Sequence, residues 1–231
     1  DELEYRIIIA LGSSYNSFSP RVADAGVISK GFLVMHNGLK VCIGTYYGLP
    51  ITKMLYKNKG VHEPEEEKIF MDVISKMPVD PVMVEMGSFW AFYSMWFLKA
   101  TKNGKVFMIE PEEKHIKVGQ RNFKKNNLQA SFDNYFIGRE SSVNGKTPVI
   151  CLDDYVHTKG IRHINIAHAD IQGFESEMLL GATKILEAIM IDYFFVSTHT
   201  IELHYDCIDF LKKYNYKVVF EVDPAKAASF D

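Results

Sequence analysis

Two short apolar segments, each with an acid at its end, constrain the fold of this chain more than any other feature. Residues 82–86 read VMVEM and are followed by Gly87, and residues 106–109 read VFMI and are followed by Glu110. A helical pattern follows each segment. In parallel α/β sheets, a glycine turn lets a nucleoside approach the backbone, and an acid at the end of the next strand accepts hydrogen bonds from ribose hydroxyls. The spacing therefore predicts a nucleoside-type cofactor beside Glu85, Gly87 and Glu110.

From residue 82 onward, segments typical of strands alternate with segments typical of helices. Several of the strand segments are continuous apolar runs, which is expected where helices cover both faces of a sheet. Right-handed crossovers between such strands give a doubly wound, mostly parallel α/β sheet, and ligands bind beyond the carboxyl ends of its strands. The expected strands are residues 82–86, 106–110, 132–137, 163–170, 189–197 and 216–222, and the expected helices are residues 90–99, 112–126, 175–188 and 201–214.

The first 60 residues lack this alternation and are expected to form an N-terminal extension, with the main domain over residues 61–231. A strand is expected at residues 5–10, and a hairpin at residues 31–44, where an Asn-Gly pair is a strong signal for a two-residue turn. A proline among four acids at residues 63–67 predicts the first turn of a helix, with its charges facing solvent.

Charge and cysteine content argue against several classes of protein. The net charge is −3, from 26 Lys and Arg against 29 Asp and Glu, so electrostatics favours neither nucleic acid nor a membrane surface as a partner. Cys42, Cys151 and Cys207 form no CxxC pair, which is typical of a reducing compartment rather than of a disulfide framework or a zinc site. No apolar run is long enough to cross a bilayer. We expect a cytoplasmic protein with a small-molecule or carbohydrate substrate, and the sequence indicates no oligomeric state.

The loop after the first of these strands narrows the choice of cofactor. A dinucleotide site needs the pattern GxGxxG, whereas here Gly87 is followed by Phe89 and Trp90, whose bulk obstructs the amides that would bind a pyrophosphate. The GxxxxGK[ST] pattern of a P-loop does not occur in the chain. A site for ribose and adenine without pyrophosphate points to S-adenosylmethionine, whose positive charge Glu85 can meet. A nicotinamide-dependent oxidoreductase is a weaker alternative, because the loop is poor in glycine.

Four segments, in order along the chain, resemble the motifs of FkbM-type S-adenosylmethionine-dependent methyltransferases. They are VEMGSFWAFYS at residues 84–94, IEP at 109–111 with GQRNF at 119–123, ADIQGFE at 169–175 with LGA at 180–182, and VSTH at 196–199. The resemblance covers roughly residues 60 to 223. It implies a class I methyltransferase sheet, which is Rossmann-like, and methyl transfer, usually to a hydroxyl oxygen of a sugar, a glycan or a polyketide-like molecule. Such sheets normally end in an antiparallel hairpin, whose last strand is expected to begin near residues 229–231.

The resemblance also implies which residues bind the cofactor. Glu85, Gly87 and Ser88 are expected to line its methionine end, and Glu110 is expected to hold the ribose diol. Asp170 follows another strand and is expected where the cofactor meets the substrate.

Methyl transfer to an alcohol needs a group that removes the hydroxyl proton as the new bond forms. His199 is the leading candidate for this base, because histidine titrates near neutrality and the segment around it matches a family motif. Asp170 has two candidate roles, as the base or as a ligand of Mg²⁺ with help from Glu175 or His199. Gln172, Glu175 and His204 are expected on the substrate side.

Other residues have simpler interpretations. His168 lies inside an expected strand and is interpreted as a core histidine, and residues 46–48 are interpreted as an ordinary loop rather than a substrate lid. Two functions stay open at this point. The first is an O-methyltransferase, and the second is a non-catalytic module that keeps the fold and serves as a binding partner or scaffold.

Overall fold

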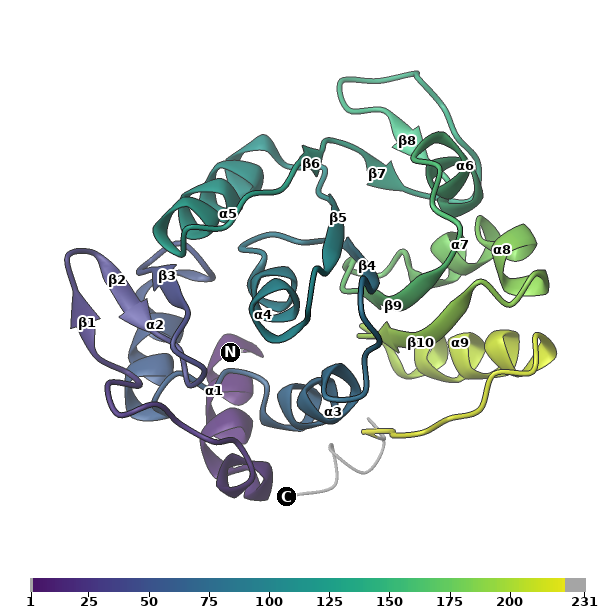
Figure 1. The fold of residues 1–231 in the computed structure, drawn as a ribbon. Coiled ribbons are helices and arrows are strands. Elements are labelled where there is room, and N and C mark those ends of the chain that lie inside the picture. The colour runs from purple at the N-terminus through teal and green to yellow at the C-terminus, as the bar shows by residue number, and fades with distance from the viewer. Residues whose placement is uncertain (1, 223–231) are drawn as a thin grey trace.

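A sheet of five parallel strands forms the centre of the molecule. The computed structural model describes residues 2–222, and Figure 1 shows how its elements are arranged. The strand order is β10-β9-β4-β5-β6, and every neighbouring pair is parallel. The strands are β4 (Val82–Met86), β5 (Lys105–Ile109), β6 (Phe132–Asp133), β9 (Ile164–Ala169) and β10 (Ile191–Val196).

The strand order reverses at the middle of this sheet. From β4 the chain passes outward to β5 and β6, and then returns to β9 and β10 on the other side of β4. Glu85 in β4 is paired with Met108 of β5 and with His168 of β9. Open α/β sheets bind ligands at such a reversal, beyond the carboxyl ends of the strands. The predicted doubly wound, parallel, Rossmann-like sheet is confirmed.

Helices cover both faces of the sheet, as the continuous apolar strands predict. Neighbouring residues of β4 point into different layers, so that Met83 packs with α3 and α4, whereas Val84 packs with the helices of the opposite face. Glu85 therefore faces α3 and α4. One face carries α3 (Pro64–Ile74), α4 (Phe92–Ala100) and α5 (Glu113–Lys125), and the other carries α6 (Leu152–Thr158), α7 (Glu175–Leu180), α8 (Thr183–Glu187) and α9 (Ile201–Lys213). Within residues 2–222, no helix has the length and apolar composition that a membrane span requires.

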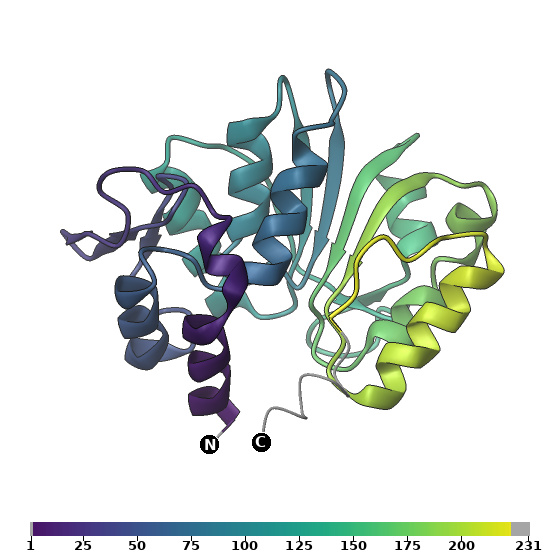
Figure 2. The same ribbon diagram turned by 90° about the horizontal axis from the view of Figure 1, so that it is seen from below.

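The N-terminal elements lie on the α4 side of the sheet, away from α9 (Figure 2). They are α1 (Glu2–Gly12), the 3-10 helix η1 (Ser14–Ser17), β1 (Ile28–Ser29), β2 (Phe32–Val34), β3 (Lys40–Cys42) and α2 (Gly48–Lys57). The three strands form an antiparallel sheet, and its β2–β3 hairpin confirms the predicted hairpin. The predicted two-residue Asn-Gly turn is wrong, because the Gly38 N–H donates to the Met35 carbonyl at 2.9 Å and the central residues of the turn are therefore His36 and Asn37. The Asn122 side chain of α5 accepts a hydrogen bond from the Cys42 backbone N–H at 2.8 Å, which attaches this small sheet to the helix layer.

A second small sheet follows β6, which is an edge strand of the central sheet. It consists of β7 (Phe136–Ile137) and β8 (Val149–Ile150), which are parallel. The sequence predicted one strand over residues 132–137 and a polar loop after it, so β8 and α6 were not anticipated.

The predicted strand at residues 5–10 is wrong, because these residues lie in α1. Leu3, Ile7 and Ala10 recur at helical intervals and pack against the core, whereas Ile8 is 64% exposed. This packing outweighs the strand propensity of the β-branched run Ile7-Ile8-Ile9.

Two further predictions, a strand at residues 216–222 and a single helix at residues 175–188, also need correction. The predicted strand at residues 216–222 does not form, and Val219 is 78% exposed. The strand expected near residues 229–231 lies outside the described residues. The predicted helix at residues 175–188 is divided at Gly181, where an added Cβ would lie 2.4 Å from the carbonyl oxygen of Gly138.

Candidate cofactor and substrate site

A pocket of about 510 Å³ lies beyond the carboxyl ends of β4, β5 and β9. All five residues predicted to bind the cofactor line it, namely Glu85, Gly87, Ser88, Glu110 and Asp170. Gln172 lines it as well, whereas Glu175, His199 and His204 are not among the lining residues. The N-terminal part of the chain contributes residues 45–48 to the lining. The interpretation of residues 46–48 as an ordinary loop therefore has to be revised.

Gly87 forms the turn that brings three strand ends together. Its φ is +76°, and an added Cβ would lie 1.9 Å from the Asp170 carbonyl oxygen. The backbone N–H groups of Gly87 and Ser88 both donate to the Ile109 carbonyl, at 2.9 and 3.2 Å. A side chain at position 87 is excluded by both the backbone conformation and the contact with Asp170.

Glu110 is held in place by the backbone around it. One carboxylate oxygen accepts a hydrogen bond from the Phe89 N–H at 3.0 Å, and the other accepts one from the Glu112 N–H at 2.9 Å. Nδ1 of His115 lies 3.2 Å from the same carboxylate, and the His115 ring stacks on Phe89 with 3.7 Å between ring centroids. The carboxylate is therefore fixed in orientation at the edge of the pocket before any ligand binds.

Glu85 lines the pocket and contacts α4. It is 3% exposed, and one of its oxygens accepts hydrogen bonds from both the N–H and the hydroxyl of Ser94. Burial raises the pKa of Glu85 to about 7, although the nearby His168 acts in the opposite direction. A carboxyl group with this pKa carries only part of a negative charge at neutral pH.

The predicted substrate-side residues gather around Asp170. Nε2 of His199 lies 3.3 Å from one Asp170 oxygen, and Nδ1 lies 2.8 Å from the fully buried Glu175. The hydrogen bonds to Asp170 and Glu175 raise the pKa of His199 to about 9, so the imidazole is protonated at neutral pH. The Gln172 amide donates a hydrogen bond to Asp170 at 2.9 Å. His204 lies apart from this cluster.

His204 contacts residues of its own part of the chain. Its Nδ1 lies 3.2 Å from the Thr198 hydroxyl, and its Nε2 lies 2.9 Å from Glu221. These contacts tie α9 to the end of β10 and to the segment that follows α9.

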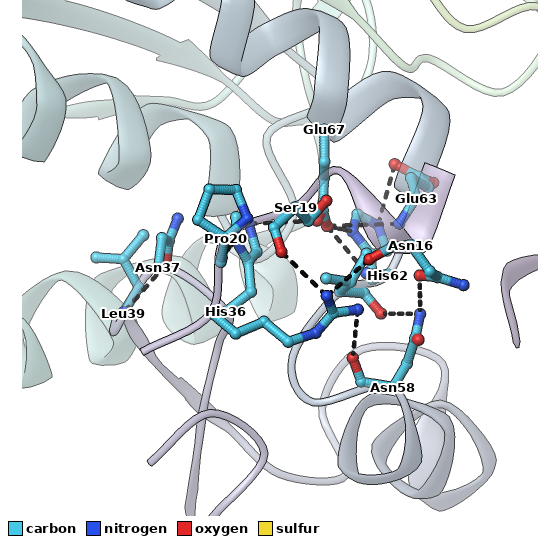
Figure 3. Close-up of polar contacts among 12 residues, drawn as sticks. Asn16, Ser19, Pro20, His36, Asn37, Leu39, Asn58, His62, Glu63 and Glu67 are labelled. Atoms are coloured by element: carbon cyan, nitrogen blue, oxygen red, sulfur yellow. Dashed lines mark hydrogen bonds and ion pairs between the residues drawn. The ribbon is translucent and has the colours of Figure 1, made fainter. Parts of the chain in front are cut away.

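Sequence reasoning missed a charged cluster beside the pocket, formed by His36, His62, Glu63 and Glu67. The expectation that the acids of residues 63–67 face solvent is wrong for Glu67, which is 1% exposed. Glu67 accepts a hydrogen bond from the His62 N–H at 2.9 Å and lies 3.0 Å from Nδ1 of His62, while Nε2 of His62 lies 3.0 Å from Glu63 (Figure 3). His36 reaches the second Glu67 oxygen at 3.3 Å. His62 and Glu63 both line the pocket.

The two acids determine the charge of His62. Burial opposes a positive charge on the ring, but Glu63 and Glu67 outweigh it and raise the pKa of His62 to about 10. For Glu63, burial raises the pKa, but His62 and Arg6 outweigh it and bring the value down to about 2. The cluster therefore presents an ionised Glu63 carboxylate to the pocket, held by a protonated His62.

The described residues offer no site for the predicted Mg²⁺. Among residues 2–222, no group of three or more His, Cys, Asp and Glu side chains is arranged to hold a metal ion. The oxygens of Asp170 and Glu175 face His199 instead. Metal-assisted activation of a hydroxyl therefore has no support in this site.

Part of the chain matches a known protein family. Residues 126–218 match the Methyltransferase FkbM domain. No curated protein sequence matches the chain. Similar solved structures include precorrin-6y C5,15-methyltransferase from Geobacter metallireducens GS-15, with 15% identity and a TM-score of 0.45 over 65% of this chain and 72% of that one.

Two other similar structures are also distant. The ribosomal protein L11 methylase from Lactobacillus delbrueckii subsp. bulgaricus has 10% identity and a TM-score of 0.45 over 70% of this chain and 74% of that one. M. capricolum TrmK, solved with S-adenosyl-homocysteine, has 12% identity and a TM-score of 0.35 over 57% of this chain and 51% of that one. These likenesses are too distant to assign a reaction to this chain.

Proposed function

We propose that this chain, whose resemblance to the FkbM methyltransferases is confirmed over residues 126–218, is an S-adenosylmethionine-dependent O-methyltransferase. One observation supports this proposal more than any other. Glu85, Gly87, Ser88, Glu110 and Asp170 come from the ends of three different strands and line one pocket. The acceptor is a hydroxyl group of a sugar, a glycan or a polyketide-like small molecule.

The residues of the pocket fit the cofactor. Glu110 is oriented by two backbone N–H groups and would accept hydrogen bonds from the ribose diol. The Gly87 turn leaves the backbone open to the ligand, and the carboxylates of Glu63 and Asp170 favour a cationic sulfonium. When bound, the cofactor supplies an electrophilic methyl group.

Asp170 is our candidate for removing the acceptor's proton. S-adenosylmethionine would supply its sulfonium methyl group to the acceptor oxygen, and Asp170 would take the proton that the hydroxyl loses. Such positioned proton removal contributes about 10²–10⁴-fold to the rate. His199 is protonated between Asp170 and Glu175 at neutral pH, so we assign it to holding Asp170 rather than to the first proton transfer.

The remaining properties follow from composition. We propose a small-molecule or carbohydrate acceptor rather than nucleic acid or a membrane, because the net charge is −3 and near balance. Cys42, Cys151 and Cys207 are free and buried, which supports a reducing compartment such as the cytoplasm.

Calorimetric titration with S-adenosylhomocysteine tests the cofactor assignment, with NAD as the comparison ligand. We expect heat with S-adenosylhomocysteine and none with NAD; the reverse result would favour an oxidoreductase and contradict the proposal. Transfer of a labelled methyl group from S-adenosylmethionine to a panel of sugars, glycans and polyketide-like alcohols then tests the reaction. Cofactor binding without transfer to any of them would favour the non-catalytic alternative.

A further inference from the structure

We propose that His168 and Ser88 bind the carboxylate group of the cofactor's amino-acid end, an inference that rests on the proposed function. Both residues line the pocket, and they are 3% and 1% exposed. Nδ1 of His168 and the Ser88 hydroxyl are buried and have no hydrogen-bond partner within the described part of the chain. Buried polar atoms in folded proteins are almost always paired, so two unpaired atoms on one pocket indicate a ligand.

The contacts of the His168 ring fix its orientation and leave Nδ1 without a hydrogen-bond partner within the described part of the chain. Nε2 lies 2.5 Å from one oxygen of Glu66, and the other Glu66 oxygen accepts a hydrogen bond from the Ser197 hydroxyl at 3.0 Å. The ring also packs on Tyr93, with 4.5 Å between ring centroids. The ring's contacts with Glu66 of α3 and Tyr93 of α4 would both be broken if the ring turned.

The surroundings of His168 make Nδ1 a donor. Burial opposes a charge on the ring, but the acids outweigh it, Glu66 most of all, and raise the pKa of His168 to about 9. At neutral pH both ring nitrogens therefore carry protons, and Nδ1–H lacks an acceptor. The titratable groups that face His168 are Glu63 and Glu66 before and in α3, Glu85 in β4, Tyr93 in α4 and Asp170 after β9.

The charges of the pocket select a carboxylate for this donor. Five lining residues are acids, namely Glu63, Glu85, Glu110, Glu112 and Asp170, and they favour the sulfonium and the ammonium group of an amino-acid end and repel its carboxylate. Ser88 and His168 are the two lining residues with an unpaired buried polar atom. Because Ser88 follows Gly87 directly, its hydroxyl lies beside the turn at which the cofactor is expected. A carboxylate offers two oxygens, one for each residue.

A pair of ligands isolates this contact. S-adenosylhomocysteine and 5′-methylthioadenosine share the adenosine and the sulfur, but the second has no amino-acid end. We expect Ser88→Ala and His168→Gln each to weaken S-adenosylhomocysteine binding by about ten- to a hundred-fold, the usual range for a hydrogen bond to a charged group. Binding of 5′-methylthioadenosine should be nearly unchanged. His163→Gln is the matched control, since His163 directly precedes the same strand but is exposed and pairs with Asp192 at 2.8 Å.

The pH dependence gives a second measurement. The difference in S-adenosylhomocysteine affinity between the unmodified protein and His168→Gln should shrink as the pH rises through about 9, where His168 loses its proton. The ligand's own amino group titrates in both proteins and cancels in this difference.

The possible results are distinct. If the unmodified protein binds neither ligand, the proposed function itself fails. If it binds both, and Ser88→Ala and His168→Gln weaken both equally or weaken neither, the carboxylate subsite is wrong while the cofactor assignment stands. Thermal unfolding is measured for each variant, and if His168→Gln does not fold, Ser88→Ala decides the question.

Discussion

Gly87 is the residue whose replacement should do most damage at the pocket. In Gly87→Ala, the new Cβ would meet the Asp170 carbonyl at 1.9 Å and would also require a φ of +76°. Left-handed backbone and overpacking together should cost about 3–5 kcal/mol of unfolding free energy, measured by urea denaturation. Gly160→Ala is the control, because its φ is +63° and nothing lies within 4 Å of an added Cβ.

Comparison of Gly87→Ala with Gly160→Ala separates the cost of the left-handed backbone from the cost of the contact with Asp170. Gly160→Ala should cost about 1–2 kcal/mol, from the backbone conformation alone. Equal losses in the two variants would mean that the contact between Gly87 and Asp170 contributes nothing, which would contradict the close approach of the two strand ends.

Glu110 should be needed for cofactor affinity. In Glu110→Gln, the amide NH₂ cannot accept a hydrogen bond, so one of the backbone N–H groups of Phe89 and Glu112 loses its partner. We expect S-adenosylhomocysteine to bind about tenfold more weakly or worse, by calorimetry. Glu113→Gln, one turn away and exposed, should bind normally. An unchanged affinity in Glu110→Gln would place the ribose elsewhere.

The buried histidines predict how stability depends on pH. His62 and His168 have folded-state pKa values raised from 6.5 to about 10 and about 9. Their protonation therefore stabilises the fold fully below about pH 6.5, and this contribution is lost as the pH rises through 9 to 10. Each group can change the unfolding free energy by up to about 1.4 kcal/mol per pH unit.

Denaturation between pH 7 and 9.5 tests this expectation. Stability should fall over that range, and less steeply in His62→Gln than in the unmodified protein. Parallel curves for the two proteins would contradict the charged state assigned to His62.

At the scale of the elements, prediction from the sequence is most accurate for strands that are buried on both faces, because these strands are continuous apolar runs. The start and end of β4 agree with the prediction, and β5 and β9 agree to within one residue. Prediction fails where tertiary contacts outweigh local preference. The isoleucines of α1 favour a strand, and residues 216–222 have strand-like composition but do not pair with the edge strand β10.

The helix α3 shows why the candidate site was predicted only in part. Residues near strand ends meet in any parallel sheet, so Glu85, Gly87 and Glu110 could be placed together from spacing alone. Burial of Glu67 depends on His36 and His62, whose positions are determined by long-range packing that a local charge pattern does not record. The same holds for His168, whose partner Glu66 is 102 residues away in the chain.

Glu67→Gln tests the contribution of this cluster to the fold. Removing one partner of a buried ion pair typically costs about 3–5 kcal/mol, because the remaining charge is left uncompensated. We expect that loss in urea denaturation for Glu67→Gln. Glu65→Gln is in the same helix but is partly exposed and contacts Ser13, so it should cost up to about 1 kcal/mol. Similar losses in both variants would show that the buried cluster is not stabilising.

For the whole molecule, the main question is whether the N-terminal elements and the central sheet unfold together. The boundary at residue 60 is a prediction from sequence, and we retain it as a description of the chain. In the core, Leu33 and Met35 of the N-terminal part belong to the same buried cluster as Met83 of β4 and Phe92 of α4. A shared core of this kind favours a single cooperative transition.

The fluorescence of the two tryptophans reports directly on the packing of the N-terminal elements against the rest of the molecule. Trp90 stacks on Tyr46 with 4.2 Å between ring centroids, and Trp96 lies 4.8 Å from the ring of His36. Their fluorescence should therefore follow the N-terminal contact, whereas far-ultraviolet circular dichroism follows all the helices. Leu33→Ala removes a side chain that is 1% exposed and should cost about 2–5 kcal/mol.

If the molecule unfolds as one unit, Leu33→Ala shifts the fluorescence and dichroism curves by the same amount. The exposed Leu49 of α2, 61% exposed, provides the control, and Leu49→Ala should shift neither curve appreciably. A fluorescence transition that moves alone would mean that the N-terminal part opens independently of the sheet. Because residues 45–48 of that part line the pocket, a cofactor bound there would then stabilise the fluorescence transition in particular, whereas in a single unit it stabilises both curves equally.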